Sequence, residues 1–436
     1  MYRIPRTGGL AARRGACGRV RDLVRSIHGS GAHNMRVLLS SWGSRGDVEP
    51  LAALALRLRE LGAEVRVCAP PDEEFAALFA RVGVTIIPLG PSTRSVAARL
   101  KPPSADDAFR LAAELVHARF ETLPAAAEGC DVLVATGLMP AGARSVAEML
   151  GIRYVLACFH IFGLPSRLFP PSARPGKQSA EGETDTRVLW QQDAERVNAL
   201  YGEPLNRQRA AIGLPPVDNV RDHVLTDRVW LAADPVLAPW KELTDLEIVQ
   251  TGAWILPDER PLPNELEAFL DAGEPPVYVG FGSMAMRTSK DLGAVAIEAT
   301  RAHGRRLILG RGWADLAMTD DDRADCIIVG DVNHQALFPR VAAVAHHGGA
   351  GTTTTAALAG APQVVVPQIV DQPHWARRVA ELGIGAAHDG AVPTSDSLAS
   401  ALGTALAPET RARATAVAAA IRTDGATEAA RRLLES

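Results

Sequence analysis

Between Ala345 and Gly385 the chain contains the residue pattern that is best suited to binding and chemistry. A short apolar run ends at two histidines, and small residues and threonines follow before an alanine-rich helical stretch. Small residues between a strand and a helix allow backbone N–H groups to approach an anion, and the helix dipole favours negative charge there. The pattern fits a diphosphate site, although a tight turn without a ligand would have the same composition. The residues expected to hold the anion are His347, Gly349, Ala350, Gly351 and Thr352.

A polar pair comes after the next apolar strand. Gln363–Pro367 is expected to be that strand, and Asp371 and Gln372 fall where the following helix should begin. A carboxylate accepts hydrogen bonds and an amide both accepts and donates them, so the pair can bind sugar hydroxyls. A diphosphate site with such an acid and amide beside it describes a site for a nucleotide sugar.

The histidines of this region raise the alternative of a metal site. His346 and His347 are adjacent, and His334 and His374 lie nearby in the sequence. Adjacent side chains of an extended chain point to opposite faces, and no spacing here matches a known zinc pattern. We therefore expect no metal and no tightly bound cofactor.

Asp47 follows the first strand-like segment, Met35–Ser41, in the sequence WGSRGD. A G-x-G-x-x-G fingerprint is absent and the second strand ends without an acid, so NAD binding is disfavoured. An aspartate at a helix start is often only a capping residue. At the C-terminal end of a strand that faces a cleft, however, it could also take the proton from an acceptor hydroxyl. We predict Asp47 as this base, and the segment Gly43, Ser44 and Arg45 as a contact for donor phosphates.

Weaker signals follow three strands of the second half. Ser283 comes after the first of these strands and suits a phosphate contact, although a tight turn is an equal alternative. Trp313 follows the next strand and fits core packing better than ligand binding. Val332 and Asn333 follow the third, where backbone groups could pair with a nucleobase. Each signal is weak alone, but all fall at strand C-terminal ends of one half.

Strand and helix patterns alternate from Met35 onward, which predicts α/β structure with parallel sheets covered by helices. A second series of strands starts near Val277. Two doubly wound domains would place their ligands at the strand C-terminal ends, in a cleft between them. We expect a first domain over residues 35–245, a second over 246–415, a linker at about 237–263, and a C-terminal helix over 416–436 that packs back toward the first domain.

Composition limits the classes of partner. Residues 1–34 carry seven arginines and one aspartate, so the rest of the chain has 39 basic and 49 acidic residues and a net charge of −10. Such an acidic body is poorly suited to nucleic acid. No apolar run reaches the length of a membrane span. The five cysteines are odd in number and lack a C-x-x-C motif, which favours buried free thiols in a reducing cytoplasm. We expect a cytoplasmic monomer, with residues 1–34 a disordered leader or an artificial extension.

These motifs together resemble the GT-B glycosyltransferases of family 1, and in particular the actinobacterial enzymes that glycosylate vancomycin- and teicoplanin-type antibiotics. The resemblance runs from Met35 to about Leu434 and includes MRVLLSSWGSRGDVEP, PVYVGFGS, VAHHGGAGTT and GAPQVVVPQIVDQP. It implies a GT-B fold of two Rossmann-like domains and inverting transfer from a UDP- or TDP-sugar to a hydroxyl of a heptapeptide aglycone.

Residue by residue, the resemblance implies that Asp47 is the base and that Ser44 and Arg45 meet the donor. It implies the diphosphate site at Ser283, His347 and Gly349–Thr352, the nucleobase at Val332 and Asn333, and sugar-hydroxyl contacts from Asp371 and Gln372. Departures from the glucose-transferring members, at Thr354, Thr355 and Pro373–Trp375, leave the sugar open. The segment His160–Tyr201 matches weakly, which leaves the acceptor open and makes this segment the expected selector of the aglycone.

Alternatives remain at the level of function. Another small natural product, such as a polyketide or macrolide, could be the acceptor. A nucleotide-sugar 2-epimerase would share the architecture but would need more acids around the sugar. A pyridoxal-dependent phosphorylase would need a Schiff-base lysine, and none of the four lysines lies in a candidate motif. A non-catalytic sugar-binding module would tolerate loss of Asp47.

Overall fold

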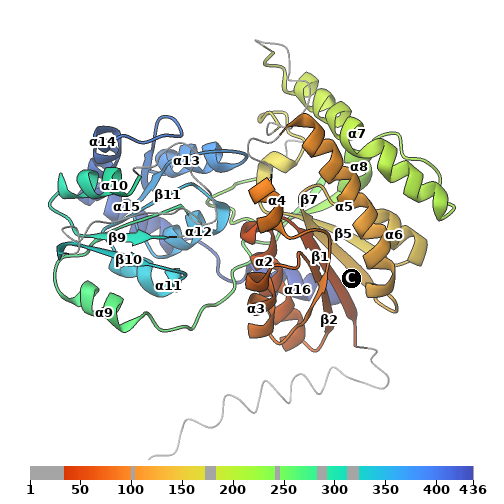
Figure 1. Cartoon of the computed structure of the whole chain (residues 1–436), viewed down its shortest axis with the longest axis horizontal. Coiled ribbons are helices and arrows are strands. Elements are labelled where there is room, and N and C mark those ends of the chain that lie inside the picture. The colour runs from red at the N-terminus through yellow and green to blue at the C-terminus, as the bar shows by residue number, and fades with distance from the viewer. Residues whose placement is uncertain are drawn as a thin grey trace, which may run out of the picture.

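The computed structural model describes residues 34–99, 104–171, 183–240, 246–281, 292–311 and 324–435. Ser283, Trp313, residues 1–33 and residues 172–182 of the proposed acceptor segment lie outside these ranges. Two parallel sheets, each covered by helices, lie side by side in Figure 1, with the first sheet on the right. This confirms the expected pair of doubly wound α/β layers.

The first sheet has seven strands in the order β3-β2-β1-β4-β5-β6-β7. Successive residues of its central strand face opposite sides, since Val37 and Leu39 belong to one core and Leu38 to another. Both faces are therefore buried, which explains the nearly continuous apolar run of β1. The strands are β1 (Arg36–Trp42), β2 (Glu64–Ala69), β3 (Ile86–Pro88), β4 (Val132–Gly137), β5 (Arg153–Cys158), β6 (Arg228–Leu231) and β7 (Glu247–Gln250).

Helices cover both faces of this sheet. In α2, Val48, Leu51, Leu54 and Leu58 recur at helical spacing and pack on the face of Val37. The opposite face is covered by α5 and α6. The helices of this half are α2 (Arg45–Glu60), α3 (Glu73–Arg81), α4 (Thr93–Arg99), α5 (Ala105–Ala126), α6 (Ala143–Leu150), α7 (Thr186–Ala211) and α8 (Val220–Leu225), with a 3-10 turn, η1 (Ile161–Gly163).

The second sheet has six strands in the order β10-β9-β8-β11-β12-β13, which repeats the winding of the first six strands of the other sheet. Its strands are β8 (Val277–Gly280), β9 (Leu307–Gly310), β10 (Cys326–Val329), β11 (Ala343–His346), β12 (Gln363–Val365) and β13 (Gly385–Ala387). Its helices are α9 (Asn264–Asp271), α10 (Leu292–Arg301), α11 (His334–Leu337), α12 (Ala350–Leu358), α13 (Gln372–Glu381), α14 (Ser395–Leu406) and α15 (Pro408–Ala418), with a 3-10 turn, η3 (Phe338–Arg340).

The connection between the sheets differs in detail from the expected linker. Strand β7 lies inside the predicted linker and pairs in parallel with β6, so the first sheet continues past the predicted boundary at residues 245–246. The extended segment 251–263 then leads to α9. The division into domains that fold independently stays a prediction.

The C-terminal region contains two helices. After α15, the last helix α16 (Gly425–Glu435) returns to the first sheet and lies against α2 (Figure 1). Ala426, Ala429, Ala430 and Leu433 are buried in the same core as β1. Three of these residues are alanines, which lets the two helices approach closely. The end of the chain therefore contributes to the core of the first half.

Leu433→Ala should lower the free energy of unfolding by about 2–5 kcal/mol, because it leaves a cavity at a fully buried position. Chemical denaturation followed by tryptophan fluorescence measures the change. Arg431→Ala, at an exposed position of the same helix, is the matched control and should be nearly neutral. Equal stabilities of the two variants would show that α16 is not part of the folded core.

Candidate active site

The predicted catalytic and donor residues lie at the C-terminal ends of strands in both sheets. Asp47 follows β1, His347 follows β11, and Asp371 follows β12. The halves touch here, because Arg45 Nη1 donates to Asp331 Oδ1 at 2.9 Å and Asp331 comes directly after β10. Ligands of doubly wound sheets bind at this edge.

Asp47 lies in the first turn of α2 and binds the turn before it. The Ser44 backbone N–H donates to Asp47 Oδ2 at 2.8 Å, and the Ser44 hydroxyl lies 3.3 Å from the same oxygen. A capping role therefore occupies one carboxylate oxygen, while Oδ1 accepts no hydrogen bond from the described residues. At Gly43 a Cβ atom would lie 2.2 Å from Asp47 Oδ2, so this approach requires glycine.

The surroundings of Asp47 adjust its acidity toward that of a base at neutral pH. The pKa of Asp47 is raised to about 6, chiefly by burial, with a further contribution from the negative charge of Asp371 and against the opposing effect of the Ser44 hydrogen bonds. Asp47 is then ionised above about pH 6 and can accept a proton.

Arg45, which was expected at the donor phosphates, binds two carboxylates in this structure. Its guanidinium contacts Glu49 at 2.6 Å, one helical turn later, as well as Asp331. Asp331 also binds Arg260 at 2.8 Å. The Arg45 side chain thus reaches the half of the second sheet, where the donor is expected. To contact a diphosphate, its guanidinium would have to bind both the phosphate and Asp331.

The two adjacent histidines have different roles. His346 is fully buried, with Nδ1 accepting from the Gly348 N–H at 3.0 Å and Nε2 lying 2.9 Å from Gln363 Oε1. His346 therefore supports the turn. Nδ1 of His347 is also buried but has no hydrogen-bond partner among the described residues. Burial lowers the pKa of His347 to about 4, against the opposite effect of Asp371, so the ring is neutral at pH 7.

The small-residue turn leads directly into α12, whose N-cap is Gly349. The backbone N–H groups of Ala350, Gly351 and Thr352 are those that a helix leaves unpaired at its start. A Cβ atom at Gly349 would lie 2.7 Å from His347 Nε2, so only glycine lets this ring lie against the turn. Neutral His347 and the helix start together form an uncharged donor set for an anion.

Asp371 and Gln372 occur at the start of α13, as expected, but both side chains have partners within the fold. Asp371 Oδ2 accepts from the indole N–H of Trp375 at 2.7 Å. Gln372 Oε1 accepts from the backbone N–H groups of Gln368 and Ile369, at 2.8 and 3.1 Å. Within the described part of the chain, Asp371 Oδ1 and the Gln372 NH₂ group have no hydrogen bond and could bind a ligand.

The segment predicted to hold the nucleobase, Val332 and Asn333, is hydrogen-bonded to the connection between the two sheets. Asn333 is buried, and its Nδ2 donates to the carbonyls of Asp258 and Arg260 at 2.7 and 2.8 Å. Its Oδ1 caps α11 by accepting from Ala336 N at 3.0 Å. Its side chain is therefore used in the fold, and a base would meet the backbone of Val332 and Asn333.

Sequence reasoning missed the contacts that hold these residues in place. The Arg45–Glu49 and Asp371–Trp375 pairs both have the i, i+4 spacing of helix neighbours, which was a usable signal. The Asp331 contact of Arg45 had no such signal, since the two residues are 286 positions apart.

Among the described residues, no group of three or more histidine, cysteine, aspartate and glutamate side chains could hold a metal ion. No helix in these ranges is long and apolar enough to cross a membrane.

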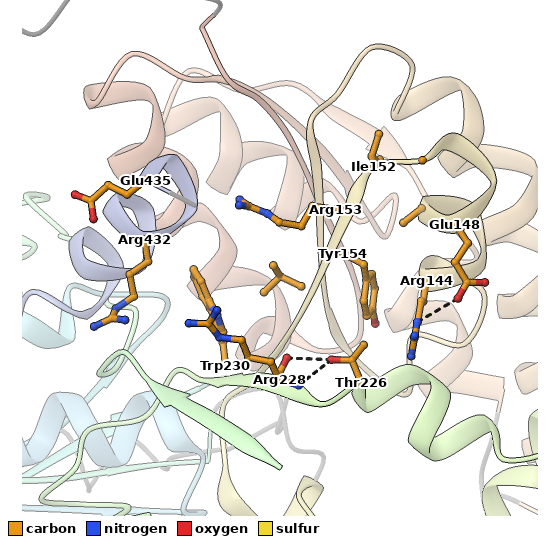
Figure 2. Close-up of a pocket in the computed structure, with 13 residues that line it drawn as sticks. Arg144, Glu148, Ile152, Arg153, Tyr154, Thr226, Arg228, Trp230, Arg432 and Glu435 are labelled. Carbon is orange, nitrogen blue, oxygen red and sulfur yellow. Dashed lines mark hydrogen bonds and ion pairs between the residues drawn. The ribbon is translucent and has the colours of Figure 1, made fainter.

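A cavity of about 620 Å³ lies elsewhere, at the N-terminal ends of β5 and β6 (Figure 2). It is therefore at the edge of the first sheet opposite to Asp47. Its lining is rich in arginine, but these side chains have protein partners, such as Glu148 for Arg144 and Glu247 for Arg228. Nothing in its geometry connects this cavity to the predicted chemistry.

Known proteins share both the fold and much of the sequence. Residues 37–160 match the glycosyltransferase family 28 N-terminal domain, and residues 323–435 match the Erythromycin biosynthesis protein CIII-like C-terminal domain. The crystal structure of the glycotransferase of kitacinnamycin superposes with a TM-score of 0.69, at 20% identity over 93% of this chain and 99% of that one. The fold is therefore that of the GT-B glycosyltransferases.

Three similar proteins come from Amycolatopsis orientalis. Glycosyltransferase GtfE is 60% identical, covering 91% of this chain and 96% of its own length. Vancomycin aglycone glucosyltransferase is 57% identical, with 92% and 98% covered, and dTDP-epi-vancosaminyltransferase is 52% identical, with 88% and 93% covered. The chain belongs to the GT-B glycosyltransferase family of these Amycolatopsis enzymes, and it is a glycosyltransferase.

The rate of sugar transfer should fall as the pH decreases through about 6, because Asp47 must be ionised to accept a proton. Asp47→Asn should reduce turnover by about 10²- to 10⁴-fold and abolish this acidic limb, with little effect on donor affinity. Initial rates between pH 5 and 8 measure both effects. A variant with near wild-type turnover would exclude Asp47 as the base.

Proposed function

We propose that this glycosyltransferase moves a sugar, with inversion, from a TDP- or UDP-sugar to a hydroxyl of a vancomycin-type heptapeptide aglycone. The main support is the 57% identity to a vancomycin aglycone glucosyltransferase over almost the whole of both chains. The donor class draws support from the 52% identity to dTDP-epi-vancosaminyltransferase. A polyketide or macrolide acceptor and a 2-epimerase activity are the alternatives, and the three Amycolatopsis relatives do not favour them.

The proposed reaction is a single displacement. The acceptor oxygen attacks the anomeric carbon from the face opposite to the nucleoside diphosphate, a C–O bond forms, and the bond from carbon to phosphate oxygen breaks. Asp47 Oδ1 takes the acceptor proton. The electron pair leaves on the diphosphate, where negative charge grows in the transition state and hydrogen-bond donors stabilise it most.

Neutral His347 and the start of α12 supply those donors. The structural support is the buried Nδ1 of His347, which has no partner within the described ranges, beside three helix-start N–H groups. This uncharged donor set requires no metal ion, so we propose that transfer is independent of divalent cations. Ser283, for which the support is its sequence position alone, is proposed as a further phosphate contact.

We propose that the segment His160–Tyr201 selects the acceptor. Its described parts include Phe162 and Phe169, whose ring centroids lie 5.5 Å apart in an edge-to-face contact. The ring centroids of Phe162 and His374 lie 4.5 Å apart, so the segment contacts α13, the helix that begins at the proposed sugar ligands. We further propose that the enzyme is a cytoplasmic monomer, supported by its acidic body and by the four cysteines of the described ranges, which form no disulfide.

Incubation of the protein with UDP-glucose, UDP-GlcNAc or a TDP-deoxysugar should yield a glycosylated heptapeptide aglycone, detected by mass spectrometry. A polyketide and a macrolide aglycone serve as parallel acceptors, and reactions without acceptor test for epimerisation of the donor. Product formed only on a polyketide or macrolide would overturn the acceptor assignment. Epimerised donor without acceptor would overturn the transfer reaction.

His347→Ala should weaken inhibition by the nucleoside diphosphate product by about tenfold or more and also slow transfer, because a buried donor to the diphosphate is lost. His117→Ala, at an exposed position of α5, is the control and should leave both unchanged. Unchanged product inhibition in His347→Ala would refute the diphosphate contact.

Addition of EDTA should not abolish transfer, and a strict requirement for a divalent ion would refute the metal-free mechanism.

A further inference from the structure

The side chain of Asp371 does not cap the helix that it precedes. An aspartate at an N-cap usually accepts a hydrogen bond from the second or third N–H of its own helix. Asp371 makes no such bond, and its Oδ2 instead accepts from Trp375 Nε1 at 2.7 Å. The indole is only 2% exposed and packs among Val365, Ala376 and Val379. The carboxylate is therefore tied to a rigid, buried group.

The turn before Asp371 is held in a strained form. Val370 has φ +57°, in the left-handed region that β-branched residues avoid. Gln372 Oε1 maintains the turn by accepting from Gln368 N and Ile369 N, and Gln368 Nε2 donates to the Ala391 carbonyl at 2.6 Å. Such strain persists where the surroundings enforce it, most often at functional sites.

Asp371 faces the reaction site. The next residue, Gln372, lies against the glycine turn after His347, since a Cβ atom at Gly348 would lie 3.4 Å from Gln372 Cβ. The negative charge of Asp371 also favours the protonated forms of Asp47 and His347. With Oδ2 occupied by the indole, Oδ1 is the oxygen without a hydrogen bond to any described residue. An ionised carboxylate only accepts hydrogen bonds, so the group that Asp371 binds must be a donor such as a hydroxyl or an amine.

We propose that Trp375 is a positioning residue for donor-sugar recognition: its indole N–H holds Oδ2 of Asp371, so that Oδ1 alone is presented to a hydroxyl or amino group of the sugar. This inference rests on the proposed function, in which Asp371 contacts the donor sugar. Trp375 does not touch the substrate. Its contribution is to prevent the carboxylate from rotating to cap α13 or to pair with another donor.

The test compares Trp375→Phe with Trp254→Phe. Trp254 is also buried, at 4% exposure, and its Nε1 donates to Thr251 Oγ1 at 3.0 Å in the core of the first half. Both variants lose a buried indole hydrogen bond, but only Trp375 contacts a proposed sugar ligand. Melting temperatures give the structural cost of each change.

Trp375→Phe should raise the KM for the nucleotide sugar by about five- to tenfold and narrow the preference for the true sugar over its deoxy analogues, while inhibition by the nucleoside diphosphate stays unchanged. Trp254→Phe should change none of these ratios. An unchanged KM in a folded Trp375→Phe protein would overturn the proposal. So would an equal loss of affinity for nucleotide sugar and nucleoside diphosphate, because that result indicates general damage to the site.

The same measurements in an Asp371→Ala background separate this inference from the proposed function. If Trp375 acts through Asp371, adding Trp375→Phe to Asp371→Ala should not change sugar affinity further. Unchanged sugar affinity in Asp371→Ala alone would instead refute Asp371 as a sugar ligand. If Trp375→Phe does not fold, benzothienylalanine at position 375 keeps the shape of the indole without its N–H. The same rise in KM is expected, and its absence would overturn the proposal.

Discussion

Every strand pairing described in both sheets is parallel, and the organisation of the site depends on this constraint. A parallel sheet presents the C-terminal ends of all its strands at one edge, where the following helices start with unpaired N–H groups. In this protein Asp47 and His347 occur at such edges of different sheets. These two edges meet, because Arg45 after β1 binds Asp331 after β10 at 2.9 Å.

Facing edges concentrate charge in a poorly solvated space. Burial disfavours the ionised carboxylate of Asp47, whose pKa is raised to about 6. Burial also disfavours the protonated ring of His347, whose pKa is lowered to about 4. Each shift suits the proposed role of the residue. A stronger base and a neutral donor to a diphosphate therefore arise from one physical cause. Because His347 and the N–H groups at the start of α12 carry no charge, they would stabilise the leaving diphosphate through oriented dipoles.

The two halves are connected by polar contacts as well as by the chain. Arg45 binds Asp331, Arg81 binds Asp258 at 3.0 Å, and the Arg422 backbone N–H donates to Asp234 at 2.9 Å. Exposed ion pairs such as Arg45–Asp331 contribute little to stability, about 1 kcal/mol or less. Ring contacts of Phe162 and Phe169 with His374 add a packed connection between the first half and α13.

Local patterns in the sequence determined much of this protein. The nearly continuous apolar run of β1, the glycine turn before α12 and the alternation of strand and helix depend on neighbours a few residues away. They predicted two doubly wound sheets with residues 43–47, 347–352 and 371–372 at helix starts. Short elements such as β3, β7 and β13 carry too few residues for a periodic signal, and β7 was assigned to a linker. The tertiary structure alone decided the contacts between distant segments. Arg45 meets Asp331 and α16 packs on α2 because the sheets and their helices bury complementary surfaces, and no pattern within a single segment contains that information. The acidity of Asp47 is decided in the same way, since it depends on burial and on Asp371, more than three hundred residues away.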